Sequence, residues 1–178
     1  MEDAYARWES MPPAVVAMSR SDAWTVLLAL QAVMSHPAFA GTGMGAAVES
    51  WGRQLQESAC DNAELYAVAE RGWNRAEPDT ASARDDGATN PATVRLMTDA
   101  YTRWKAMGQA SATASRRDTW VVMMALQLAV SHPAIGETAM GPVVESAGRQ
   151  LQAGLCDDLE LYAMAEAGWD RAADVDQC

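Results

Sequence analysis

The segment SRSDAWTVLLALQAVMSHP, residues 19–37, returns at residues 115–133 as SRRDTWVVMMALQLAVSHP. Between Trp24 and Met34 almost every position is apolar, and a helix that is apolar on all sides lies inside a fold. The apolar run is shorter than the roughly 20 residues that a bilayer-spanning helix needs. Each segment therefore predicts a buried central helix that other helices surround.

The two segments belong to a longer repeat. At a constant offset of 96 residues, about 42 of 74 aligned positions are identical between residues 3–76 and 99–172. We therefore expect an all-α fold built by tandem duplication of a roughly four-helix unit. Units of this size are marginally stable alone, so the two should dock about a pseudo-two-fold axis as one helical bundle.

The predicted units are residues 1–76 and residues 91–178, the second of which ends in a short polar tail. Between them, residues 77–90 read EPDTASARDDGATN, which is polar and has no periodicity, so this segment should be a linker. Helical spacing of apolar residues predicts eight helices in all and no strand.

Polar spacing predicts local contacts within these helices. Asp3 with Arg7, and Asp99 with Arg103, are four residues apart in the first helix of each unit and should form ion pairs. Asp61 should cap the fourth helix, because Glu64 follows at capping-box spacing; the second copy repeats the pattern with Asp157 and Glu160.

Composition restricts the partners. The net charge of −11 opposes direct binding to nucleic acid or to an anionic membrane, because both depend on Lys and Arg. A mimic of DNA would need carboxylates at regular exposed spacing, whereas the acids here are scattered. Lys105 is the single lysine among 13 cations, which with abundant Ala and Gly indicates a GC-rich bacterial genome. No secretion signal opens the chain, so we expect a cytoplasmic protein.

The two histidines, His36 and His132, lie at the ends of the central helices. Metal sites usually need clustered ligands such as an HExxH motif, which is absent, so we expect no metal and no cofactor. The sequence Ser-His-Pro is instead typical of a helix stop. There the ring can bind the terminal carbonyl groups of the helix.

Other polar residues have both a structural and a functional interpretation. Glu49 and Arg53 are four residues apart on one helix, as are Glu145 and Arg149, so they form exposed ion pairs or contact a ligand or partner. Gln31 and Gln127 interrupt the apolar central helices. A buried amide without a partner costs roughly 1 to 3 kcal/mol, so each should bond to a helix end, to its counterpart in the other unit, or to a ligand, and we favour the structural bond.

Cysteine and glycine patterns give weaker signals. Cys60 and Cys156 precede a helix start, where a thiol either packs as a small apolar group or becomes a nucleophile; we favour packing. Together with Cys178 they should be free thiols. The glycines in GTGMG, residues 41–45, resemble a phosphate loop, but no strand is expected before them and the second copy reads ETAMG.

Tryptophans should organise the core. Trp24 and Trp120 lie in the central helices and are expected to be buried anchors. Trp51 aligns with Ala147, the largest loss of side-chain volume between the two third helices. Such a difference would leave a cavity in a shared core, so we expect Trp51 at the seam between units or on an exposed partner-binding patch, with the seam preferred.

No set of residues meets the demands of catalysis, so the sequence favours a non-enzymatic helical module that binds a protein partner or self-associates. One alternative is a small-molecule or enzymatic site at the interface between the repeats; a further alternative is an acidic DNA mimic. Convergence of the polar candidates in a closed pocket would favour the small-molecule site. The candidate ligand or partner residues are Gln31, His36, Glu49, Trp51, Arg53, Gln127, His132, Glu145 and Arg149.

Overall fold

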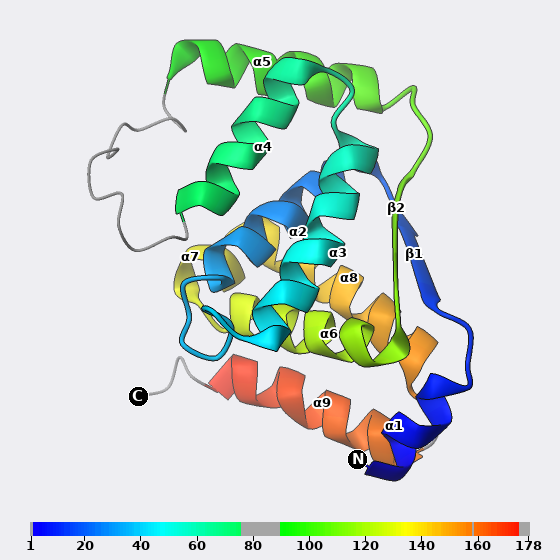
Figure 1. Ribbon diagram of the computed structural model, residues 1–178. Coiled ribbons are helices and arrows are strands. Elements are labelled where there is room, and N and C mark those ends of the chain that lie inside the picture. Colours follow the sequence, from blue (N-terminus) through cyan, green and yellow to red (C-terminus); the bar gives the residue numbers. More distant parts are fainter. Residues whose placement is uncertain (1, 76–89, 158, 175–178) are drawn as a thin grey trace.

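The computed structural model describes residues 2–75, 90–157 and 159–174, and this part of the chain is mostly helical (Figure 1). The predicted helical class is therefore confirmed. The helices are α1 (Glu2–Glu9), α2 (Arg20–Val33), α3 (Gly43–Ala59), α4 (Ala63–Arg75), α5 (Pro91–Trp104), α6 (Arg116–Val130), α7 (Pro133–Gly136), α8 (Met140–Leu155) and α9 (Leu159–Asp174).

Two short strands, β1 (Ala14–Met18) and β2 (Ala110–Ala114), correct the expectation that the chain has no strand. They pair antiparallel with Val16 opposite Ala112, and both of these side chains are buried. Proline before β1 disfavours helix, and its two valines favour an extended chain. The alanine- and serine-rich β2 carries no such signal. It is extended because it pairs with β1.

The central helices are α2 and α6, which contact each other and pack on α3 and α8. Trp24 is 3% exposed and Trp120 is 5% exposed, so both are the predicted core anchors. Each helix begins at a serine cap: the Ser19 hydroxyl accepts from the Asp22 amide at 3.1 Å, and Ser115 does the same for Asp118. This satisfies one of the free amides of the first turn.

The first helix of each predicted unit packs on the other unit. Helix α1 contacts α6, and the ring centroids of Trp8 and Trp120 are 5.6 Å apart. Helix α5 contacts α2 and α4, and Trp104 lies 5.9 Å from Trp24. Figure 1 shows α1 beside the start of α9 at one end of the molecule and α5 beside α4 at the other.

Ion pairs follow the same crossed arrangement. The guanidinium of Arg103 on α5 does not bond to Asp99 of its own helix. It donates to both oxygens of Asp61, at 2.7 and 3.0 Å. Arg7 on α1 donates to Asp157 at 3.2 Å. The predicted pairing within the first helix is thus replaced at Arg103 by a bond between units, while the side chain of Asp3 lies outside the described residues.

Asp61 is not the cap of α4, which corrects the predicted capping box. The Asn62 side chain accepts from the Leu65 amide at 2.9 Å and caps the helix instead. The hydrogen bond from Arg103 holds the pKa of Asp61 below its ordinary value, so this carboxylate is committed to the bond with α5. Residue 158, which aligns with Asn62, lies outside the described residues.

Cys60 and Cys156 are thiols that are not joined in a disulfide, and both pack against the hydrophobic core. Burial, followed by the nearby charge of Asp61, raises the pKa of the Cys60 thiol to about 11. The thiol is therefore protonated at neutral pH, which agrees with the packing role rather than the nucleophilic one. Cys178 lies outside the described residues.

Trp51 is only 1% exposed, so the expectation of an exposed patch is wrong. It lies on α3, which packs on β2 and α6. One turn later on the same helix face, the Gln54 side chain accepts from the Thr113 amide at 2.9 Å; Ser58 accepts from the Ser111 amide at the same distance. Trp51 therefore lies on the face of α3 that meets β2.

The strands explain how one half accommodates Trp51 and the other Ala147. Next to α3, the inward residues of β2 are alanines, including Ala114. The aligned residue of β1 is Met18, which lines a hollow together with Ala147 on α8. A large helix residue thus meets a small strand residue in one half, and the sizes are reversed in the other. The reversal conserves part of the core volume, and exchanges that conserve volume are the best tolerated.

We therefore predict that Trp51→Ala destabilises the protein by about 3 to 5 kcal/mol and that adding Ala114→Met recovers part of this loss. Alone, Ala114→Met should also destabilise, by about 1 to 3 kcal/mol, because it overpacks the site beside Trp51. Urea denaturation of the two single variants and the double variant measures the coupling. Additive effects would show that the two side chains do not share this space.

Candidate functional site

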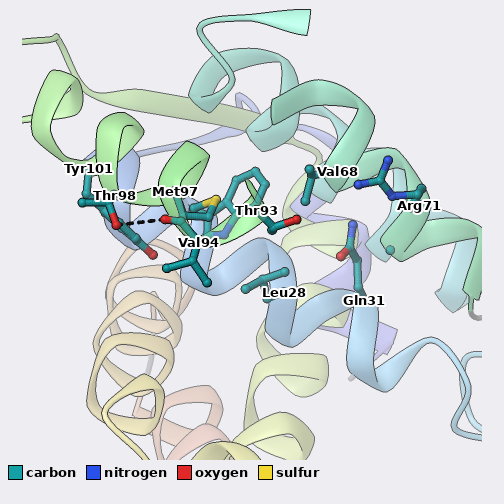
Figure 2. Close-up of a pocket in the computed structure, with 11 residues that line it drawn as sticks. Leu28, Gln31, Val68, Arg71, Thr93, Val94, Met97, Thr98 and Tyr101 are labelled. Carbon is teal, nitrogen blue, oxygen red and sulfur yellow. Dashed lines mark hydrogen bonds between the residues drawn. The ribbon is translucent and has the colours of Figure 1, made fainter. Parts of the chain in front are cut away.

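A cleft of about 450 Å³ opens between α2, α4 and α5, and we call it the α2–α4–α5 cleft (Figure 2). Helices α2 and α4 come from the first predicted unit and α5 from the second, so the cleft lies between the two units. Its lining residues are Trp24, Leu28, Gln31, Val68, Arg71, Gly72, Thr93, Val94, Met97, Thr98 and Tyr101.

The walls and rim of the cleft are mainly apolar. Trp24 is buried against Trp104, whereas the rim residues are open to solvent: Leu28 is 38% exposed, Val94 is 50% exposed and Tyr101 is 38% exposed. Burial raises the pKa of the Tyr101 phenol, which therefore stays neutral at physiological pH. A hollow surrounded by exposed large apolar side chains is typical of an interaction site.

Several polar side chains also line the cleft. Gln31 on α2 donates to the Ala69 carbonyl of α4 at 2.8 Å. Thr98 donates its hydroxyl to the Val94 carbonyl of its own helix at 2.9 Å. Figure 2 shows Arg71 beside Gln31 at one end of the cleft and Tyr101 with Thr98 at the other. Within the described part of the chain, the side chain of Arg71 forms no hydrogen bond or ion pair.

The sequence did not identify this cleft, although Gln31 was a candidate. The amide fits because Gly72 faces it: a Cβ at this position would overlap the Gln31 side chain. Gln127 repeats the arrangement on the other side of the molecule, where it donates to the Ala165 carbonyl at 2.8 Å and faces Gly168. Both glutamines therefore have a structural bond, but its acceptor is a carbonyl within a neighbouring helix and not the expected helix end or the other glutamine. Gln31 also lines the cleft.

The predicted Glu49–Arg53 pair is part of a larger network. Arg53 donates to Glu49 at 2.8 Å and to both oxygens of Glu70 at 2.9 Å. Gln56 donates to Glu70 at 3.0 Å and accepts from the buried indole of Trp73 at 2.7 Å. The sequence missed Glu70 because it lies on a different helix. The network joins α3 to α4 and has a structural role.

The second unit repeats this network on α8 and α9. Arg149 donates to Glu145 at 2.8 Å and to Glu166 at 2.9 Å. Gln152 links Glu166 to the indole of Trp169, with bonds of 2.7 Å on both sides. Gly148 lets the Trp169 ring lie close to α8, since a Cβ at this position would overlap the ring.

Both histidines are exposed, and neither lines the α2–α4–α5 cleft. The ring Nδ1 of His36 accepts from the Ala38 amide at 3.2 Å, and that of His132 accepts from the Ala134 amide at 3.3 Å. These bonds begin the turn that follows each central helix. The expected bond from the ring to terminal carbonyls is therefore replaced by one in which the ring is the acceptor.

The candidate residues do not converge. Gln31 lines the α2–α4–α5 cleft, whereas Glu145 and Arg149 border a shallow hollow along α8. Among the described residues, no group of three His, Cys, Asp or Glu side chains is placed to hold a metal ion. No helix in the described ranges is long and apolar enough to cross a membrane.

The chain matches no protein-family model, no curated protein and no solved structure. Geometry is therefore the basis for any functional assignment.

We predict that the Glu70 carboxylate contributes stability that acid removes. Hydrogen bonds from Arg53 and then Gln56 lower its pKa, so this stability is present above the unfolded value of about 4.3 and is lost as the pH falls through the lower folded value. Glu70→Gln should therefore reduce stability at pH 7 and make stability less dependent on pH between about 5 and 3.

Urea midpoints at pH 7 and pH 3.5 measure this difference. Glu64→Gln, on the exposed side of the same helix, is the matched control and should keep the parent's pH dependence. If the urea midpoint fell by the same amount between pH 7 and pH 3.5 in all three proteins, the role assigned to Glu70 would be contradicted.

Proposed function

We propose that the protein is a non-enzymatic helical module whose α2–α4–α5 cleft receives apolar side chains of a protein partner. The observation that carries the proposal is the apolar rim formed by Leu28, Val94 and Tyr101 around an open hollow. A protein partner would cover the rim as well as the hollow. Buried apolar anchors surrounded by such a rim supply most of the binding energy in protein interfaces.

Arg71 adds a chemical preference to the proposed site. It lies at one end of the cleft, and in the described part of the chain it has no ion-pair partner. The aligned residue of the second unit is Ala167, so this cation is a feature of the first unit alone. A partner segment with a carboxylate next to its apolar anchors would therefore gain a charge-assisted hydrogen bond.

The second candidate function is small-molecule binding at the same place. The volume of about 450 Å³ lies within the roughly 300 to 1,000 Å³ of ligand pockets, and the cleft is at the interface between the two predicted units. A small molecule would be enclosed on most sides and would leave the apolar rim in water. The open rim therefore favours the protein partner.

We also propose that the chain arose by duplication and has a pseudo-two-fold axis. The strand register supports this: Val16 pairs with Ala112, which is its aligned residue at the 96-residue offset, and Ala14 with Ala114 mirrors Met18 with Ala110. An axis through the Val16–Ala112 pair would relate the crossed contacts of α1 and α5. In such an arrangement each unit is completed by the first helix of the other.

Val94→Asp tests the proposed interface, because it places a charge on the exposed rim and should leave the fold intact. Val15→Asp is the matched control: Val15 is 68% exposed on β1 and does not line the cleft. A partner captured by the parent and by Val15→Asp, but lost from Val94→Asp, is the expected result. After its identification, titration calorimetry should show at least a tenfold loss of affinity for Val94→Asp.

Retention of the same partner by Val94→Asp, with parental affinity, would contradict a site at the cleft. Native mass spectrometry of the purified parent separates the second candidate, since a co-purifying small molecule that is lost from the Val94→Asp variant would favour ligand binding instead.

A further inference from the structure

A second hollow, of about 210 Å³, lies between β1 and α8. Met18 and the nearby Asp22 of α2 line one side. Ala147 and Val143 of α8 line the other, and Ser146 and Gln150 border it on the same helix. The Met18 and Ala147 side chains are almost fully buried, whereas Ser146 and Gln150 are exposed, so the hollow has an apolar floor and a polar mouth.

In the other half the corresponding helix is hydrogen-bonded to its strand. There α3 approaches β2 so that Gln54 and Ser58 accept from two strand amides, and Trp51 lies on the same helix face. On α8 the residue aligned with Ser58 is Gly154, which has no side chain to accept such a bond. Within the described residues the side chain of Gln150, which aligns with Gln54, forms no hydrogen bond. The gap between α8 and β1 follows from these differences.

The two halves also differ in the side chain that the helix places against the strand. Position 147 carries alanine where the aligned position 51 carries an indole. Met18 fills part of the difference, yet about 210 Å³ remains. For comparison, an apolar cavity of about 150 Å³ is large enough to bind benzene. One planar ring system therefore fits, but an extended polypeptide segment does not.

The polar mouth adds a second requirement. Within the described residues, neither the Asp22 carboxylate nor the Gln150 amide forms a side-chain hydrogen bond. The oxygen atoms of both groups, and that of the Ser146 hydroxyl, can accept a hydrogen bond from a bound molecule. The Met18 sulfur on the floor makes favourable contacts with aromatic rings.

From this geometry we infer that the hollow beside Ala147 is a binding site for a small planar aromatic molecule with a ring N–H donor, of the size of indole. The ring lies against Met18 and Ala147, and its N–H group donates to an acceptor at the mouth. This site is separate from the α2–α4–α5 cleft and does not depend on the function proposed there.

Titration of the isotope-labelled full chain with indole tests the inference by nuclear magnetic resonance. The expected result is saturable binding with shifts centred on the Met18 methyl group and the Gln150 side-chain amide. Indene, which has nearly the same shape but no N–H group, should bind at least threefold more weakly. Equal affinity for the two probes would overturn the assigned donor, and the absence of saturable shifts at millimolar indole would overturn the site.

Ala147→Trp supplies the matched variant, because it places the missing indole in the hollow. It should weaken binding of indole at least tenfold, whereas Ala163→Trp, on the exposed side of α9, should not change it. If Ala147→Trp does not fold, Ala147→Leu fills part of the same space and should still weaken binding several-fold. Parental affinity in a folded Ala147 variant would show that indole binds elsewhere.

Discussion

The antiparallel ladder between β1 and β2 decides which helices can meet. Strand β1 joins α1 to α2, and β2 joins α5 to α6. Because the two strands pair antiparallel, with Val16 opposite Ala112, α1 packs on α6 and α5 packs on α2. Each crossed contact includes a pair of tryptophan rings. The Trp8–Trp120 pair is buried, as is the matching pair at the other end, and such aromatic pairs contribute about 0.5 to 1.5 kcal/mol beyond their buried area. Each half therefore packs a buried tryptophan against the central helix of the other.

Each candidate site includes a residue that differs between the two similar halves. Arg71 at the α2–α4–α5 cleft aligns with Ala167, and Ala147 at the second hollow aligns with Trp51. Elsewhere the halves use the same solutions, as in the glutamine bonds between helices and the arginine networks that end on a buried tryptophan. Shared features therefore account for the fold. The features that differ are the better guide to function.

Periodicity could predict the central helices and their anchors because it reports which side of a helix is buried. It does not report which neighbour covers that side, so the crossed packing of Trp8 and Trp104 could not be predicted. The same limit explains Asp61, whose spacing fits a local cap but whose carboxylate binds Arg103 across the molecule. Strand β2 has no β-forming residues beyond one threonine, so its structure depends on a distant partner. The cleft is formed by three helices from both predicted units, and among the residues that line it only Gln31 was a candidate from the sequence.

The crossed packing of the first helices is the central claim, and nuclear Overhauser contacts between indole protons test it most directly. Single Trp→Phe variants would assign the indole signals of Trp8, Trp24, Trp104 and Trp120. The structure predicts contacts between Trp8 and Trp120 and between Trp24 and Trp104, whose ring centroids are 5.6 and 5.9 Å apart. Contacts of Trp8 with Trp24 and of Trp104 with Trp120 would show that each first helix packs within its own unit, and would contradict this account.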